Sequence, residues 1–219
     1  MLVCYSFFLG LDIKIMRILT DDEYHSEAEP MLRKIFLNEN PKQPQFGSST
    51  EEVILLYEYF PPDAEIVHAL VNIASHLGDK SLYLSIINIV DLNSSMIKHW
   101  LVPFEEISTY LSIDTNSFGL AYQMESVIFS PQGKWALMSS FERYAILAGT
   151  KDFMENFLKH FPDTDRQILN YLSIFKECIN KDGVEKVNIF WLGDFLKNVY
   201  GIEQAKELLR ASELEKYVY

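Results

Sequence analysis

The sequence predicts an α+β fold in which helices pack on a mixed or antiparallel sheet of about four to five strands. Three observations lead to this prediction. Helical patterns open the chain, strand-like apolar runs fill its middle, and further helical patterns close it. Of the 219 residues, 48% are hydrophobic, which is enough for a packed core. This order of elements favours helices layered on a sheet, with a helical C-terminal region.

The chain divides into four segments. Residues 1–15 form an N-terminal extension, which is either an extra strand or the result of a translation start upstream of Met16. Residues 16–50 hold a helical segment and a linker. Residues 51–162 form the α+β core, and we expect the helices of residues 163–219 to pack on that core as one domain.

The N-terminal helical segment runs from Thr20 to Leu37, with Thr20 or Asp21 as its cap and acidic residues in its first turn. Pro30 lies inside this segment, so we expect a kink or two short helices. The stretch that follows, Asn38–Thr50, is rich in Pro, Asn, Gln, Gly and Ser and is typical of a linker.

A strand, a helix and a second strand open the core. The apolar run Val53–Phe60 ends at Pro61 and Pro62 and predicts a central strand. Asp63 caps a helix that reaches Leu77, and Ser81–Val90 is the next strand. If the two strands are parallel neighbours, the connection between them is a right-handed crossover.

Shorter strands complete the sheet. His99–Pro103 predicts a short strand before a helical turn, and Ala121–Phe129 and Lys134–Ser140 predict a hairpin. Tyr144–Leu147 is a candidate for one more short strand. The C-terminal helices are predicted from apolar spacing, at the following ranges: 150–161, 163–179, 187–200 and a last helix that includes Ala205 to Leu214.

The charge of the chain limits its partners. With 19 basic and 31 acidic residues the net charge is −12, which opposes binding to nucleic acid and to anionic membranes. The same charge suits a basic protein partner, although it also serves solubility. Cys4 and Cys178 match no metal or redox spacing, so we expect reduced thiols and a cytoplasmic location.

Signatures of cofactor and metal binding are lacking in the sequence. No glycine-rich loop joins a strand to a helix, which argues against a nucleotide cofactor. His68 and His76 are eight residues apart on one predicted helix, too far to share an ion. The acidic cluster around His25 does not have the spacing of a calcium loop. We therefore expect neither a cofactor nor a metal.

The stretch Ser130–Phe153 is the strongest candidate for a functional edge, because it predicts a turn, a strand ending in polar residues and a capped helix start. We expect a partner-binding surface at this end of the sheet, formed by Trp135, Glu142, Arg143, His99, Trp100 and Ser140. The alternative is an enzyme in which Glu142, His99 and Ser140 meet in a cleft. A third interpretation is a buried folding signature without a functional role.

The same stretch resembles immunity proteins of bacterial polymorphic-toxin systems. The resemblance is carried by Gly133-Lys134-Trp135, Ser139 to Glu142, Ala145 to Thr150, and Phe153, while Ala136 and Ala148 stand where glycines are expected. It implies a non-enzymatic inhibitor that fills the cleft of a toxin with an acidic surface. A basic toxin domain is then the expected protein partner, and opposite charge would speed their encounter.

Overall fold

The computed structural model describes residues 16–57, 63–89, 99–111 and 124–218. Within these ranges the strands form a single sheet of seven strands in the order β1-β4-β3-β5-β6-β7-β2, and every neighbouring pair is antiparallel. The strands are β1 (Arg17–Ile18), β2 (Glu52–Tyr57), β3 (Ser81–Ile89), β4 (His99–Pro103), β5 (Met124–Phe129), β6 (Trp135–Ser140) and β7 (Tyr144–Gly149).

The α+β class is confirmed, but the sheet is larger than the four to five strands expected from the sequence. Each of β2 to β7 overlaps a strand range expected from the sequence, and the strand that was not expected is β1, which has only two residues and pairs with β4 through Ile18 and Trp100. A run of two residues is too short for a period-two pattern to stand out.

Between β2 and β3, its first two long strands, the chain crosses from one edge of the sheet toward the opposite edge. β2 and β3 point the same way, but β5, β6 and β7 lie between them. They are therefore not parallel neighbours, and helix α3 (Ala64–His76) crosses the whole meander. Asp63 caps α3 as expected, since its side chain accepts a hydrogen bond from Glu65 N at 2.7 Å.

One face of the sheet, which we call the α3 face, packs against α3, α5 (Lys151–His160), the turn η2 (Phe104–Glu106) and α4 (Ile107–Leu111). Its central strands contribute Ile128, Leu137 and Leu147. Helix α5 presents Phe153 and Phe157 to this layer, which confirms the helix predicted over 150–161 from apolar spacing.

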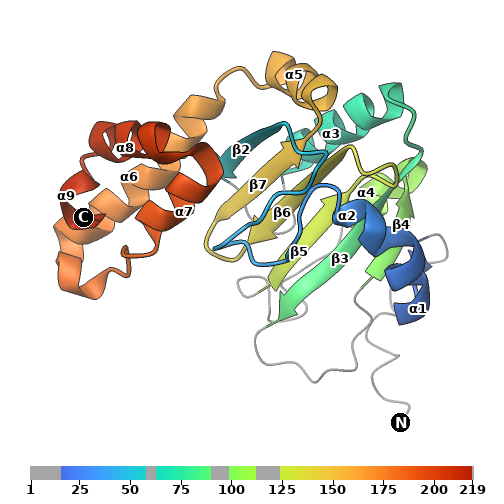
Figure 1. The fold of residues 1–219 in the computed structure, drawn as a ribbon, viewed down its shortest axis with the longest axis horizontal. Helices are drawn as coiled ribbons and strands as arrows, with labels where there is room; N and C mark the ends of the chain where they lie inside the picture. Colours follow the sequence, from blue (N-terminus) through green and yellow to red (C-terminus); the bar gives the residue numbers. More distant parts are fainter. Residues whose placement is uncertain (1–15, 58–62, 90–98, 112–123, 219) are drawn as a thin grey trace, which may run out of the picture.

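The opposite face, which we call the α6 face, packs against residues from both ends of the chain. In Figure 1 the N-terminal segment crosses in front of the sheet, and the C-terminal helices lie at its β2 side. The N-terminal elements are α1 (Asp21–Glu23), the π-helical turn η1 (Tyr24–Ala28) and α2 (Glu29–Leu32). The C-terminal elements are α6 (Thr164–Asp182), η4 (Val184–Lys186), α7 (Leu192–Tyr200), α8 (Ile202–Ala211) and α9 (Glu215–Val218).

Pro30 explains the irregular first helix. Proline has no N–H to donate to the carbonyl one turn back, and here the turn before it widens, with Glu29 N–H bonded to Tyr24 O. The helical segment ends at Leu32, not Leu37, and hydrogen bonds of single turns continue to Phe36.

Two of the predicted C-terminal helices were wrong in their bounds. The helix expected from residue 187 begins at Leu192 as α7, after the turn η4. The last helix is split into α8 and α9, and Glu213 lies at the break with a φ of 60°.

The prediction of a central strand from Val53 was wrong, because β2 lies at the edge of the sheet beside β7. Its outer edge is closed by side chains of the C-terminal helices. Leu55 N–H donates to the Tyr200 hydroxyl of α7 at 2.8 Å, and Tyr57 N–H donates to Gln167 Oε1 of α6 at 3.3 Å. In Figure 1 these helices lie beyond the β2 edge. Two backbone donors that an edge strand would leave open are therefore satisfied.

A buried carboxylate fixes the turn between β5 and β6. Asp79 accepts hydrogen bonds from Ser130 Oγ at 2.7 Å, Gln132 Nε2 at 2.8 Å and Trp135 Nε1 at 3.2 Å. Asp79, Ser130 and Trp135 are buried. The carboxylate thus joins the end of the α3 layer to the start of β6.

Replacing Asp79 by Ala should lower the free energy of unfolding by about 3 kcal/mol, because it leaves the Trp135 and Ser130 donors buried without an acceptor. Urea denaturation measures this change. The matched control, Glu207→Ala, removes an exposed carboxylate of α8 and should change stability by less than about 0.5 kcal/mol. Equal losses in both variants would show that Asp79 does not hold the turn.

Candidate functional site

The six residues singled out in the sequence do not form one surface in the structure. Trp135 and Trp100 are buried on the α3 face, and Trp135 stacks on Phe153 with ring centroids 5.2 Å apart. Trp135 begins β6 whereas Ser140 ends it, so they lie about 17 Å apart along the strand. The tryptophans thus lie in the core, away from the polar end of β6.

His99, Ser140, Glu142 and Arg143 do lie at the same end of the sheet, although on different strands and turns. His99 starts β4, and β3 and β5 separate β4 from β6, a distance of about 14 Å. In the described part of the chain, His99 and Glu142 share no hydrogen bond. His99 Nδ1 instead lies 2.9 Å from Ser85 Oγ.

The ring of His99 supports the N-terminal helical segment. It stacks on the Tyr24 ring with centroids 3.5 Å apart and planes 8° apart. Leu19 N–H also donates to His99 O at 3.0 Å. His99 therefore holds the first helical turns against the edge of the sheet.

We call residues 21–29 the acidic segment, because five of its nine side chains are carboxylates: Asp21, Asp22, Glu23, Glu27 and Glu29. Thr20 caps it through a reciprocal pair of bonds, Glu23 N to Thr20 Oγ1 at 3.2 Å and Thr20 N to Glu23 Oε2 at 2.8 Å. The buried side chains of Tyr24 and Ala28 attach the segment to the core.

Arg17 neutralises part of this charge. Its guanidinium lies 2.6 Å from Glu23 Oε1 and 3.5 Å from Glu27 Oε2. Asp21 and Asp22 are exposed, and neither forms an ion pair with a described residue. Over residues 16–30, five carboxylates and one arginine give a net charge of −4.

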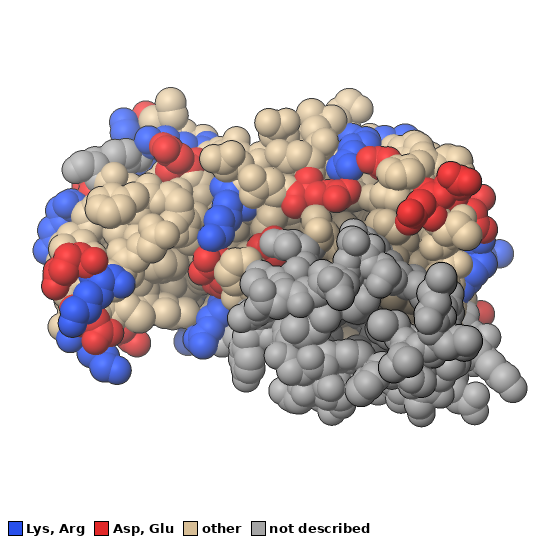
Figure 2. Space-filling model, turned by 90° about the horizontal axis from the view of Figure 1, so that it is seen from below, with Lys and Arg blue, Asp and Glu red and all other residues tan. Residues whose placement is uncertain are grey.

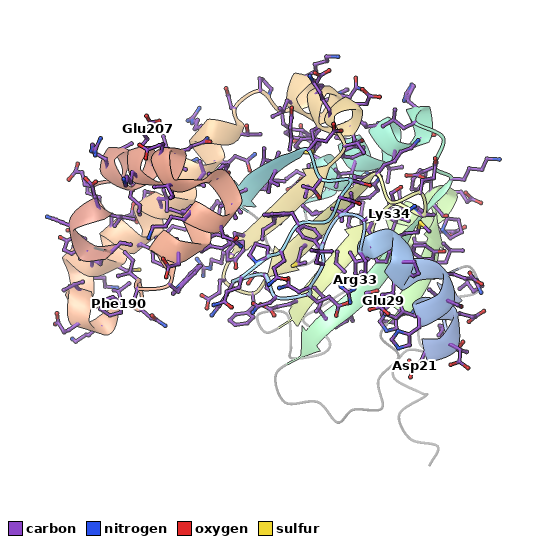
Figure 3. The ribbon with its side chains drawn as sticks, in the orientation of Figure 1. Asp21, Glu29, Arg33, Lys34, Phe190 and Glu207 are labelled. Carbon is purple, nitrogen blue, oxygen red and sulfur yellow. The ribbon has the colours of Figure 1, made fainter. Side chains whose placement is uncertain are left out.

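A second set of pairs links the acidic segment to the chain that follows. Arg33 bonds Glu29 Oε1 at 2.6 Å and Glu39 Oε1 at 2.9 Å, and the Tyr24 hydroxyl donates to Glu39 at 2.9 Å. Figure 3 shows Glu29 and Arg33 close together, with Asp21 at the outer end of the segment. These pairs keep the segment in one orientation.

Hydrogen bonds set the titration of this region. The Glu29 carboxylate, 2.6 Å from His25 Nδ1, raises the pKa of His25, while His25 and Arg33 lower the pKa of Glu29. Burial, followed by the charge of Glu39, raises the pKa of Tyr24. The tyrosine therefore stays neutral and donates its proton to Glu39.

The turn between β6 and β7 forms a second polar feature at the same end of the sheet. Arg143 adopts a φ of 67°, a left-handed conformation that a side chain other than glycine seldom takes. Glu142 Oε1 lies 2.7 Å from Lys42 Nζ, which comes from the loop after α2. Ser140, buried just before the turn, donates to Glu125 Oε1 at 3.1 Å.

Two buried tyrosines lie below this turn. Tyr144 and Tyr171 pack edge to face with centroids 5.6 Å apart, and neither hydroxyl has a hydrogen-bond partner in the described ranges. Burial raises the pKa of both phenols, and the charge of Glu142 adds to this effect. Both phenols are therefore neutral at physiological pH.

In the part of the chain that the structure describes, no three His, Cys, Asp or Glu side chains are arranged to hold a metal ion. No described helix is long and apolar enough to cross a bilayer.

No protein-family model, curated protein or solved structure matches this chain. The assignment of function therefore depends on the residues and their geometry.

Sequence reasoning missed Tyr24, Arg33 and Lys42, whose contacts organise both polar features. The capping pattern Thr20-x-x-Glu23 is a local signal that points to the start of the acidic segment. Lys42 has no such signal, because its partner Glu142 is one hundred positions away in the sequence.

The His25–Glu29 pair gives a prediction about pH. Replacing Glu29 by Gln should return the pKa of His25 toward its ordinary value of 6.5, as followed by NMR of the imidazole C–H groups. Because the pKa of His25 is raised on folding, its stabilising contribution is full below pH about 6.5 and is lost as the pH rises through the folded value. Unchanged titration in Glu29→Gln would contradict the pairing.

Proposed function

We propose that this protein is a non-enzymatic binding protein, of the immunity type, that neutralises a basic toxin domain in the cytoplasm. The acidic segment is the surface that would meet the partner. The observation that carries the proposal is the excess of carboxylate on a segment fixed to the sheet. Asp21 and Asp22 are exposed and form no ion pair with a described residue, while Glu23 and Glu27 share one guanidinium, that of Arg17.

Rigidity supports a role in recognition. The segment is held by the Thr20–Glu23 capping box, by the Tyr24–His99 stack and by the Arg33 pairs. Charges fixed before binding lose little conformational entropy on association, so more of their attraction appears as affinity.

The position of the charge also supports the proposal. Figure 2 shows acidic groups gathered at the side of the molecule where α1 lies in Figure 1, whereas basic and acidic groups alternate over the C-terminal helices. In residues 163–219 eight basic side chains offset ten acidic ones. A basic partner would be drawn toward the N-terminal helical side.

Among the described residues, no hydrogen bond joins the side chains of Glu142 and His99, which the enzyme alternative would need. Glu142 is paired with Lys42, and His99 lies against Ser85 and Tyr24. We therefore advance the binding function alone.

The test compares two triple variants that each remove three negative charges. The first, Asp21→Asn, Asp22→Asn and Glu27→Gln, alters the acidic segment. The matched control, Glu177→Gln, Asp182→Asn and Glu207→Gln, alters exposed acids of α6 and α8. The partner in the assay is the purified protein encoded by the gene next to the one for this chain. Its binding is measured by surface plasmon resonance at low and at physiological salt.

The first variant should bind about tenfold more weakly, mainly through slower association, and should lose most of the salt dependence of the wild type. The control should keep affinity within about twofold. Equal losses in both variants would assign the effect to net charge, and unchanged binding in both would exclude the acidic segment as the interface.

A further inference from the structure

An aromatic and acidic cage surrounds the ammonium group of Lys42. Lys42 Nζ lies 5.4 Å from the centroid of the Phe141 ring, 5.6 Å from that of the Trp191 ring and 2.7 Å from Glu142 Oε1. Both ring distances fall within the range of cation–π attraction. We propose that Phe141, Glu142 and Trp191, the ammonium cage, form a binding site for an alkylammonium group that Lys42 occupies in cis.

The walls of the cage are held without Lys42. Trp191 Nε1 donates to Asn188 O at 3.1 Å, and its ring packs on Phe195 at 5.4 Å and on Phe175 at 6.1 Å. Such contacts fix the indole before any ligand arrives, as a built site requires.

The carboxylate wall is also fixed independently. Glu142 lies in the tight turn that Arg143 closes with its left-handed backbone, and Glu142 N–H donates to Ser140 Oγ at 3.3 Å. Two rigid strands, β6 and β7, lead into and out of this turn.

Lys42 comes from a separate segment, residues 38–46, which we call the strap. Asn38 Nδ2 donates to Gln43 O at 2.9 Å, Leu37 N donates to Gln45 O at 2.7 Å, and Asn198 of α7 bonds Pro44 O. The backbone of the strap is thus fixed by contacts that do not involve the Lys42 side chain.

Solvent reaches the cage. The side chains of Lys42 and Glu142 are 37% and 33% exposed, so an ammonium group from outside can replace that of Lys42 without unfolding of the core. The ligand class is a primary or methylated ammonium on an alkyl chain, such as a lysine side chain of another protein. This site is separate from the acidic segment and stands whether or not the proposed function does.

The test removes the cis occupant. Lys42→Ala should bind n-butylammonium with a millimolar dissociation constant, seen as a shift of the Trp191 indole N–H signal in NMR spectra. The wild type should bind at least about tenfold more weakly, because its own tethered lysine competes at a high effective concentration. Lys42→Gln is a second variant that keeps most of the side chain without its charge and should behave like Lys42→Ala.

Three controls test whether binding needs the positive charge of the ligand, the Glu142 carboxylate and the aromatic rings. The uncharged analogue n-butanol should not shift the signal, and Lys42→Ala combined with Glu142→Gln should lose binding. Lys176→Ala also frees a paired carboxylate, that of Glu213, and should bind no butylammonium there. Equal binding of butanol, binding that survives Glu142→Gln, or no shift in either well-folded Lys42 variant would overturn the proposal.

Discussion

Burial of the sheet on both faces is the constraint on which the rest of the structure depends. Every residue of β6 and β7 is buried, so side chains that alternate between two faces both need an apolar cover. The α3 face is covered by helices that lie within the core sequence. The α6 face receives its cover from both ends of the chain, and this brings Tyr24 and Trp191, 167 positions apart in the sequence, onto one layer. The acidic segment and the polar turn between β6 and β7 both lie on that layer.

The class of fold could be predicted from the sequence, because strand and helix periods are local properties. The α3 and α5 helices and the β5–β6 hairpin followed from apolar spacing, caps and the turn at Gly133. The order of strands did not follow, since nothing local to β2 states that it pairs with β7 rather than β3. Likewise β1 is recognisable only through its partner β4.

The candidate site was harder to predict than the fold. A sequence shows that Trp135 is large and aromatic, but the acceptor of its buried indole N–H is Asp79, which lies 56 positions earlier. The sequence predicted His99 as a partner-binding residue. In the structure its ring stacks on Tyr24, so His99 supports the acidic segment. The acidic residues themselves were visible from the start. That they lie on a fixed segment could not be predicted, because the capping box, the ring stack and the Arg33 pairs are contacts of the folded chain.

The closure of the β2 edge has a consequence for self-association. Tyr200 and Gln167 occupy two of the amide groups that a strand from a second molecule would need for pairing. The C-terminal helices therefore obstruct pairing along this part of the β2 edge and also form a layer of the core. A chain cleaved between α5 and α6 would lose these contacts, and the exposed edge of β2 would be open to pairing with a strand of a second copy.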